Sequence, residues 1–347
     1  ITAFDTEGFA CTIAGEVKEF DAAEAFPSPK EVRRTDRFAQ FGIHAGWQAL
    51  NDSGLDLEQA NRERVGAMIG SGIGGLATLE TQHKTLLDRG PGRMSPFFIP
   101  MMILNMASGM FSLYQGLRGP NVATCSACAT ANHAIGEAWR TLVMGEADVM
   151  FAGGTEAAVL PSAMGGFAAM KALSTRNDDP GLASRPFDAG RDGFVMGEGA
   201  GVLLLETEEH AKARGAKIYC ELAGYSANCD AYHITAPHPE GEGMANCLTA
   251  AVAGAALALT ATSEWTTRPT CGGPLPPGGR PPAPRPCPAA RGPGPPRRPR
   301  GPPPRPAPAP PFQHAPWPRR RRARGLGAPH CQICVGRILR WPSPSDR

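Results

Sequence analysis

A cysteine is the first residue of this sequence whose type and position could do chemistry. Cys128 lies at a predicted strand-to-helix junction, within the sequence Thr124-Cys-Ser-Ala-Cys128-Ala-Thr-Ala-Asn132. At a helix start, unpaired backbone N–H groups and the helix dipole favour a thiolate, and the same groups can stabilise an oxyanion on an attached acyl group. The small neighbours Ser126, Ala127 and Ala129 let the chain turn sharply and expose the sulfur. The pattern indicates a nucleophile, although a buried and inert cysteine is the commoner use of this residue.

A glycine-rich loop is the second candidate. The sequence Gly70-Ser-Gly72-Ile-Gly74-Gly75 matches G-x-G-x-x-G, follows a strand pattern and precedes a helical one, which is the context of a dinucleotide site. The next strand end carries no obvious acidic partner for a ribose, and Asp88 belongs to a predicted helix end. Two interpretations stay open: a dinucleotide-binding oxidoreductase, or glycines that allow close backbone packing at a pocket.

The elements that must position these residues alternate between helix and strand from about residue 30 to 258. Apolar spacing predicts helices over residues 38–50 and 131–144. Short apolar runs predict strands over residues 65–69, 121–124, 148–152 and 201–206. Strand, helix and strand in repetition indicate a layered α/β domain with a largely buried sheet.

Composition divides the 347 residues into two parts. Residues 1–258 carry 19 Lys and Arg against 30 Asp and Glu, a balance of −11, and form the predicted α/β domain. Residues 259–347 carry 16 Arg, no Lys, two acidic residues and 25 of the 36 prolines. We therefore predict a disordered Pro/Arg/Gly-rich tail over residues 259–347, because such a segment cannot bury enough apolar surface to order itself.

Three interpretations of the tail compete. It is a natural segment that binds nucleic acid or proline-binding modules, an inert disordered segment, or an out-of-frame translation of GC-rich DNA. The absence of lysine beside 16 arginines favours the frame error, since lysine codons are AT-rich. The sequence His330-Cys331-Gln-Ile-Cys334 could hold a metal, and Cys125 with Cys128 could form a redox or metal pair, but neither has a second pair in a packed context, so no metal site is predicted.

Several classes of protein are excluded by simple counts. The longest apolar run, residues 247–259, is about 13 residues, whereas a membrane-spanning helix needs roughly 20. The sequence opens on Ile1 without a secretory signal, and we expect this start to be a fragment boundary. The ten cysteines show no disulfide framework, so reduced thiols in a cytoplasmic protein are expected.

Two longer runs carry the most specific pattern: Cys128-Ala-Thr-Ala-Asn-His-Ala-Ile-Gly136 and Gly145-Glu-Ala-Asp-Val-Met-Phe-Ala-Gly-Gly-Thr-Glu156. With further segments at residues 95–98, 116–120, 172–177, 184–188, 191–194 and 230–233, they resemble the β-ketoacyl-[acyl-carrier-protein] synthases of the elongating type, synthase II, over about residues 5–250. The resemblance implies the thiolase-like fold, in which two similar α/β halves form five layers, here mainly the amino-terminal half. It also implies a homodimer and an acyltransferase of fatty acid biosynthesis.

The resemblance also assigns residues. Cys128 matches the acyl-accepting nucleophile, and Ile73 matches the gate at the mouth of the acyl channel, which places the glycine loop at the acyl pocket. Phe98 and Phe167 match apolar lining positions, with Phe98 expected to reach across the dimer. Ordinary packing in the core is the alternative for both phenylalanines.

The implied reaction has two steps and uses no resident cofactor. An acyl group passes from the phosphopantetheine of acyl carrier protein to Cys128, and malonyl-carrier protein then loses CO₂ and attacks the thioester. The family uses two histidines from its carboxyl-terminal half for the second step, and their motifs are missing from residues 234–347. His133 is a poor substitute, because it projects roughly 140° away from Cys128 at about 100° per helical residue. We therefore expect these 347 residues not to catalyse the condensation step.

A basic cluster is the best candidate for carrier-protein docking. Carrier proteins are acidic, as are residues 1–258, so docking needs a local positive patch. Lys30, Arg33 and Arg34 provide one. A solvated helix start is an almost equally good explanation of these three residues. Neither nucleic acid nor a membrane is an expected partner.

Overall fold

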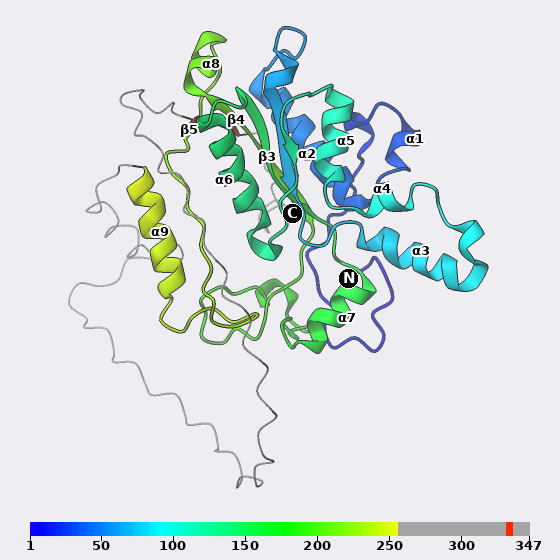
Figure 1. The fold of residues 1–347 in the computed structure, drawn as a ribbon. Coiled ribbons are helices and arrows are strands. Elements are labelled where there is room, and N and C mark those ends of the chain that lie inside the picture. Colours follow the sequence, from blue (N-terminus) through cyan, green and yellow to red (C-terminus); the bar gives the residue numbers. More distant parts are fainter. Residues whose placement is uncertain (256–330, 336–347) are drawn as a thin grey trace, which may run out of the picture. The chain divides into compact units, whose positions relative to one another are not determined.

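One mixed β-sheet organises the computed structural model, which describes residues 1–255 and 331–335 (Figure 1). The strands run in the order β2-β1-β3-β4-β6-β5, with β1 parallel to β2 and β3, and β4 antiparallel to β3 and β6. Their bounds are β1 (Val65–Gly70), β2 (Asn121–Val122), β3 (Val149–Glu156), β4 (Gly199–Thr207), β5 (Cys220–Glu221) and β6 (Cys331–Val335).

Nine α-helices accompany the sheet within the described residues. They are α1 (Pro29–Val32), α2 (Arg37–Ser53), α3 (Leu76–Arg89), α4 (Phe98–Met102), α5 (Met106–Gln115), α6 (Thr130–Val143), α7 (Pro161–Ala169), α8 (Glu208–Ala213) and α9 (Glu242–Gly254). Local chemistry sets the ends of α2: the Asp36 carboxylate accepts a hydrogen bond from the Phe38 N–H, and Gly54 ends the helix with a φ of +63°. The predicted helices over residues 38–50 and 131–144 are confirmed as α2 and α6.

The two faces of the sheet are covered by different helices, as Figure 1 shows. Alternate strand residues such as Ile69 and Phe151 pack with Phe38 and Phe111 of α2 and α5. On the opposite face, the residues between them pack against the alanine-rich side of α6; these are Met68, Met150, Ala152 and Leu205. A fully buried side chain of this size contributes about 2 kcal/mol, so these contacts hold the helices on the sheet and the strands in fixed register.

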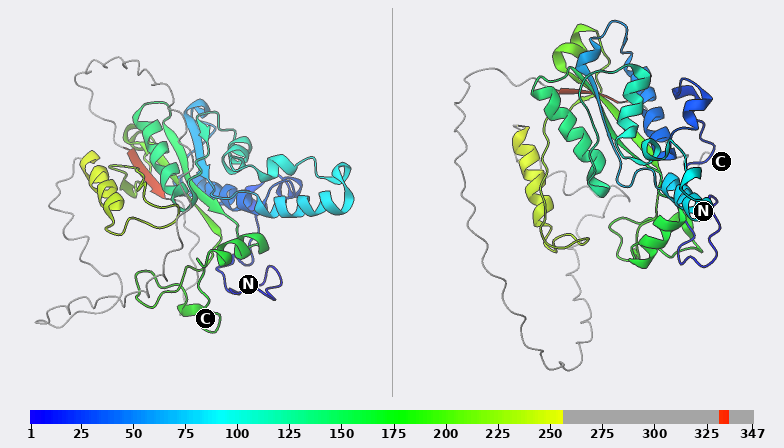
Figure 2. Two further views of the ribbon diagram at one scale, coloured as in Figure 1. Left: turned by 60° about the horizontal axis from the view of Figure 1, so that its bottom comes forward. Right: turned by 45° about the vertical axis from the view of Figure 1, so that its right-hand side comes forward.

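The amino end of α3 is tied to the amino end of α2. The buried Asp36 carboxylate accepts hydrogen bonds from the Thr78 N–H at 2.9 Å and from the Thr78 hydroxyl at 2.6 Å. Thr78 is the only buried residue of α3, and Figure 2 shows this helix extending away from the sheet. The glycine loop between β1 and α3 is therefore anchored at both of its ends.

Strand lengths differ from the sequence prediction at two places. The strand predicted over residues 121–124 contains only Asn121 and Val122, because the chain then turns toward α6. The strand predicted over residues 148–152 continues to Glu156, since Gly153 and Gly154 still pair with β4 and β1.

One segment of the predicted tail belongs to the sheet. Residues 331–335 form β6, which pairs with β4 and β5. Ile333 and Val335 are β-branched, which favours an extended chain, and β4 offers the pairing groups of its outer edge. The rest of residues 259–347, including His330, lies outside the described residues. The described residues form one sheet with helices on both faces.

Candidate active site

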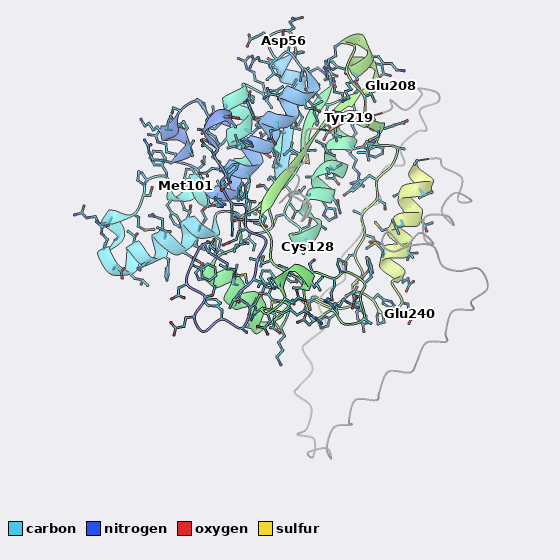
Figure 3. All side chains as sticks on the ribbon, turned by 180° about the vertical axis from the view of Figure 1, so that it is seen from behind. Asp56, Met101, Cys128, Glu208, Tyr219 and Glu240 are labelled. Atoms are coloured by element: carbon cyan, nitrogen blue, oxygen red, sulfur yellow. The ribbon has the colours of Figure 1, made fainter. Side chains whose placement is uncertain are left out.

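Cys128 lies where the chain leaves the sheet and enters α6. It lies in a single 3₁₀ turn, Ala127–Ala129, and α6 begins directly afterwards at Thr130. Its side chain is exposed, and Figure 3 shows it at the opposite end of the sheet from Glu208. Ala127 has a φ of +50°, a left-handed conformation that costs a non-glycine residue about 1–2 kcal/mol. The sharp turn expected before the cysteine is thus present and strained.

Three hydrogen bonds hold this turn on the first turn of α6. The Ser126 N–H donates to the Thr130 hydroxyl at 2.9 Å, and the Thr124 hydroxyl donates to the Thr130 carbonyl at 3.0 Å. The Ser126 hydroxyl and Nδ1 of His133 share a hydrogen bond of 2.5 Å. His133 therefore supports the turn through Ser126, in agreement with its expected direction away from Cys128.

A cavity of about 560 Å³ opens beside Cys128. Ile73 and Phe167, both named from the sequence, lie on its wall together with Phe194 and Met196. The rings of Phe167 and Phe194 meet edge to face with centroids 5.5 Å apart. Much of the remaining wall is backbone, contributed by Gly70, Gly72, Gly154, Gly197, Gly199 and Gly201. A largely apolar cavity next to a thiol suits an acyl chain attached to that sulfur.

Ile73 also borders a second cavity. This one has a volume of about 210 Å³, and its other lining residues come from the start of α3 and the end of α4: Gly75, Leu76, Leu79, Met102, Ile103 and Leu104. The Ile73 side chain is 38% exposed, so it is not locked into either cavity by packing. Ile73 thus borders both cavities, and the gate role that the resemblance implies for it stays a prediction.

The glycine loop is bonded to a carboxylate of its own chain. One oxygen of Glu156, at the end of β3, accepts hydrogen bonds from the Gly72 N–H at 2.9 Å and the Ile73 N–H at 3.1 Å. The other accepts one from the Ser71 hydroxyl at 3.0 Å. Burial raises the pKa of Glu156, although these hydrogen bonds act in the opposite direction by favouring the carboxylate. A phosphate would need the same N–H groups, so the geometry favours the pocket interpretation of the loop over a dinucleotide site.

The remaining predicted residues lie elsewhere. Phe98 begins α4 and is not among the residues that line the Cys128 cavity, so its role across a dimer stays a prediction. Lys30 and Arg33 are exposed at α1. Arg34 is instead held by Glu31 at 2.9 Å, with its guanidinium 4.4 Å from the centroid of the Phe97 ring.

Sequence reasoning missed Glu156, Phe194 and Met196. Glu156 ends one of the two runs quoted for the resemblance, but nothing in its immediate neighbourhood shows that it reaches a loop 84 residues away. Within residues 1–255 and 331–335, no group of three or more acidic, His or Cys side chains is arranged to bind a metal. In the same residues, none of the helices has the length and apolar character needed to span a membrane.

Comparison with known proteins gives the same assignment for most of the chain. The family model described as "Beta-ketoacyl synthase, N-terminal domain" matches residues 3–211. The chain is 54% identical over 249 residues to the 3-oxoacyl-[acyl-carrier-protein] synthase 2 of Vibrio harveyi, covering 72% of this chain and 60% of that protein. The synthase 2 of Staphylococcus aureus is 52% identical over 252 residues, with 73% and 62% covered. The chain thus spans about 60% of the length of these curated relatives.

Solved structures agree with the fold. A β-ketoacyl synthase from Burkholderia phymatum STM815 superimposes with a TM-score of 0.66 at 35% identity, covering 72% of this chain and 60% of that one. The ishigamide ketosynthase/chain length factor gives a TM-score of 0.68 at 30% identity, with 75% and 62% covered. A type II polyketide ketosynthase in complex with its acyl-carrier protein gives 0.65 at 29% identity, with 74% and 63% covered. The layered α/β fold expected from the sequence is therefore that of the thiolase-like ketosynthases, and the chain belongs to the β-ketoacyl synthase family.

Proposed function

We propose that this chain carries the acyl-accepting part of a 3-oxoacyl-[acyl-carrier-protein] synthase. The observation that carries the proposal is the exposed Cys128 at the amino end of α6, on the wall of a 560 Å³ cavity lined by Ile73, Phe167 and glycine backbone. The relatives named synthase 2 share this segment of the fold. The start of α6 supplies backbone N–H groups that can stabilise the thioester oxygen as it becomes negatively charged.

The first step is transfer of an acyl group to the Cys128 sulfur. The thiolate attacks the carbonyl carbon of an acyl thioester, a new carbon–sulfur bond forms, and the carrier thiolate leaves and takes up a proton. The carrier's phosphopantetheine brings the substrate, so the proposed reaction needs no resident cofactor or metal. The apolar wall around Ile73 and Phe167 then receives the acyl chain.

The second step is carbon–carbon bond formation. Malonyl thioester loses CO₂, and the carbanion attacks the acyl-Cys128 carbonyl to release a 3-oxoacyl thioester and the free thiolate. Among the described residues no histidine hydrogen-bonds to the Cys128 sulfur, and His133 is committed to Ser126. Since the sequence also lacks the family's two histidine motifs, we expect these 347 residues to accept an acyl group and not to condense it.

The proposal includes partners and location. Acyl carrier protein is the expected donor, with the exposed Lys30 and Arg33 as its contact, and the intact enzyme is expected to be a cytoplasmic homodimer. The edge strand β2 supports a dimer, because it ends the sheet and Val122 is 51% exposed there. No binding to nucleic acid is expected. Light scattering on the purified chain measures the oligomeric state.

Mass spectrometry of the whole chain after incubation with an octanoyl thioester of acyl carrier protein tests the proposal. We expect one octanoyl group on the peptide that contains Cys128, and none on the Cys128→Ala variant. Cys125→Ala is the matched control, because Cys125 is exposed three residues away and is expected to be dispensable. Acylation that survives Cys128→Ala, or that requires Cys125, would show that the nucleophile has been misassigned.

A further inference from the structure

One carboxylate on the cavity wall, that of Glu156, is used by no step of the proposed chemistry. Glu156 collects three hydrogen bonds from three consecutive residues, Ser71, Gly72 and Ile73. The Ser71 hydroxyl in turn accepts a hydrogen bond from the Gly74 N–H at 2.9 Å. A single carboxylate at the end of β3 thus organises the whole turn between β1 and α3.

The loop packs closely against its neighbours on both sides. A Cβ on Gly72 would lie 2.9 Å from the Glu156 carboxylate oxygen, so the loop backbone rests directly on this side chain. The far side of the turn is equally close to its neighbours, because a Cβ on Gly75 would lie 2.4 Å from the Met101 carbonyl oxygen. The Gly75 N–H donates to the Met102 carbonyl at 3.0 Å. Glu156 is therefore one of two fixed supports between which the Ile73 backbone is held.

Ile73 connects this support to acyl binding. Its N–H is bonded to Glu156, and its side chain borders both the cavity that contains Cys128 and the 210 Å³ cavity lined by Leu76 and Leu79. We propose that Glu156 is a positioning residue: by fixing the backbone of Gly72 and Ile73, it holds the Ile73 side chain between the two cavities and so sets the length of acyl chain that Cys128 accepts. This inference rests on the proposed acyl transfer to Cys128.

The alternative is that Glu156 merely stabilises the fold. Glu16 provides a matched control, because its carboxylate also accepts hydrogen bonds from two backbone N–H groups and one hydroxyl, those of Thr2 and Ala3. Glu16 does not line the Cys128 cavity. Glu156→Gln is the conservative variant, since its amide oxygen can still accept from Gly72 and Ile73 and its NH₂ group can donate to Ser71.

The experiment compares wild type, Glu156→Ala, Glu156→Gln and Glu16→Ala in the full chain. The acylation rate of Cys128 is measured with butanoyl, octanoyl and hexadecanoyl thioesters, and the alkylation rate with iodoacetamide reports the intrinsic access to the sulfur. In Glu156→Ala we expect the ratio of hexadecanoyl to butanoyl rates to rise about tenfold with the iodoacetamide rate unchanged, because the released loop no longer keeps Ile73 between the cavities. Glu156→Gln and Glu16→Ala are expected to keep the wild-type ratio.

Two results would overturn the inference: a wild-type ratio in Glu156→Ala, or the same altered ratio in Glu156→Gln or Glu16→Ala. Hydrogen exchange of the peptide that contains Gly72 and Ile73 is the second measurement, and we expect faster exchange in Glu156→Ala but not in Glu156→Gln. If no thioester acylates the wild-type chain, the proposed function fails. The exchange experiment then still decides whether Glu156 positions the loop, and unchanged exchange in Glu156→Ala would refute it.

Discussion

The hydroxyl of Ser126 lies 2.5 Å from Nδ1 of His133, so the residue two places before Cys128 is bonded to the first turn of the helix that follows it. The turn that carries Cys128 is therefore joined to α6 by this hydrogen bond as well as by the backbone. Since α6 packs on the sheet through Ala134 and Ala138, the position of Cys128 is defined relative to β1 and β3.

A double-mutant cycle on Ser126 and His133 measures this closure. Ser126→Ala and His133→Ala each remove one partner, and we expect a coupling free energy of about 0.5–1.5 kcal/mol in urea unfolding. The pair Ser126→Ala with Asn132→Ala is the control, because Asn132 is exposed on the same turn. A coupling for Ser126 and His133 no larger than the control coupling would show that the bond does not support the turn.

The left-handed conformation of Ala127 predicts that a β-branched side chain is poorly tolerated at this position, directly before Cys128. Ala127→Val is expected to lower the free energy of unfolding by about 1–2 kcal/mol, because a β-branched side chain tolerates positive φ poorly. Ala129→Val, two residues on with a φ of −86°, is the matched control and should change stability by about 0.5 kcal/mol or less. Equal effects of the two valines, measured by urea unfolding, would contradict a strained turn at Ala127.

A buried carboxylate on β4 predicts acid sensitivity. Burial alone would raise the pKa of Glu206, but hydrogen bonds from Arg214 and His210 outweigh burial and leave the pKa below its ordinary value. The stabilisation is thus fully present above the unfolded-state pKa of about 4.3 and is lost as the pH falls through the lower folded-state pKa. We expect the free energy of unfolding to decline below about pH 4.3.

The variant Glu206→Gln isolates this contribution. It is expected to be about 3 kcal/mol less stable than wild type at neutral pH, because Arg214 keeps its charge while the paired carboxylate is lost. The difference from wild type should shrink as the pH falls below about 4. Parallel stability curves for wild type and Glu206→Gln between neutral pH and pH 3 would show that the Glu206 pKa is not depressed.

Carrier-protein docking is tested best at Lys30 and Arg33, which are both exposed. Arg34 is bonded to Glu31 and stacked on Phe97, so its reversal would disturb α1 itself. Lys30→Glu with Arg33→Glu is expected to weaken binding of acyl carrier protein about tenfold at low salt, and less at high salt because exposed charges are screened. Lys84→Glu, an exposed cation on α3, is the control. Unchanged affinity in calorimetry would place the docking surface elsewhere.

Elements built on local periodicity were predictable, and contacts across the fold were not. The apolar spacing that continues through Phe38 and Phe41 predicted α2, and the run after Val65 predicted β1, because both patterns are set by a single packed face. The position of Cys128 followed from the small residues before it. Glu156 could not be found in this way, since its partners are distant in sequence and its role exists only when β1 and β3 are paired.

The end of the chain shows the opposite case. Composition marks residues 259–347 as unlike the domain before it, but averages conceal the five-residue strand Cys331–Val335. A strand this short has no periodicity of its own to recognise. It is defined by the edge of β4, which supplies hydrogen-bonding partners that no local pattern reveals.

Six of the residues on the wall of the Cys128 cavity are glycines, so any substitution at these positions adds side-chain atoms to the wall. A Cβ on Gly197 or Gly201 would enter open space, whereas one on Gly154 would lie 2.7 Å from the Cβ of Ala131. Substitution at the first two can only take room from an acyl chain, and substitution at the third must displace α6. Room for a longer chain can be gained only where large side chains stand, as at Ile73 or Phe167. A single substitution is therefore more easily found that narrows this cavity than one that widens it.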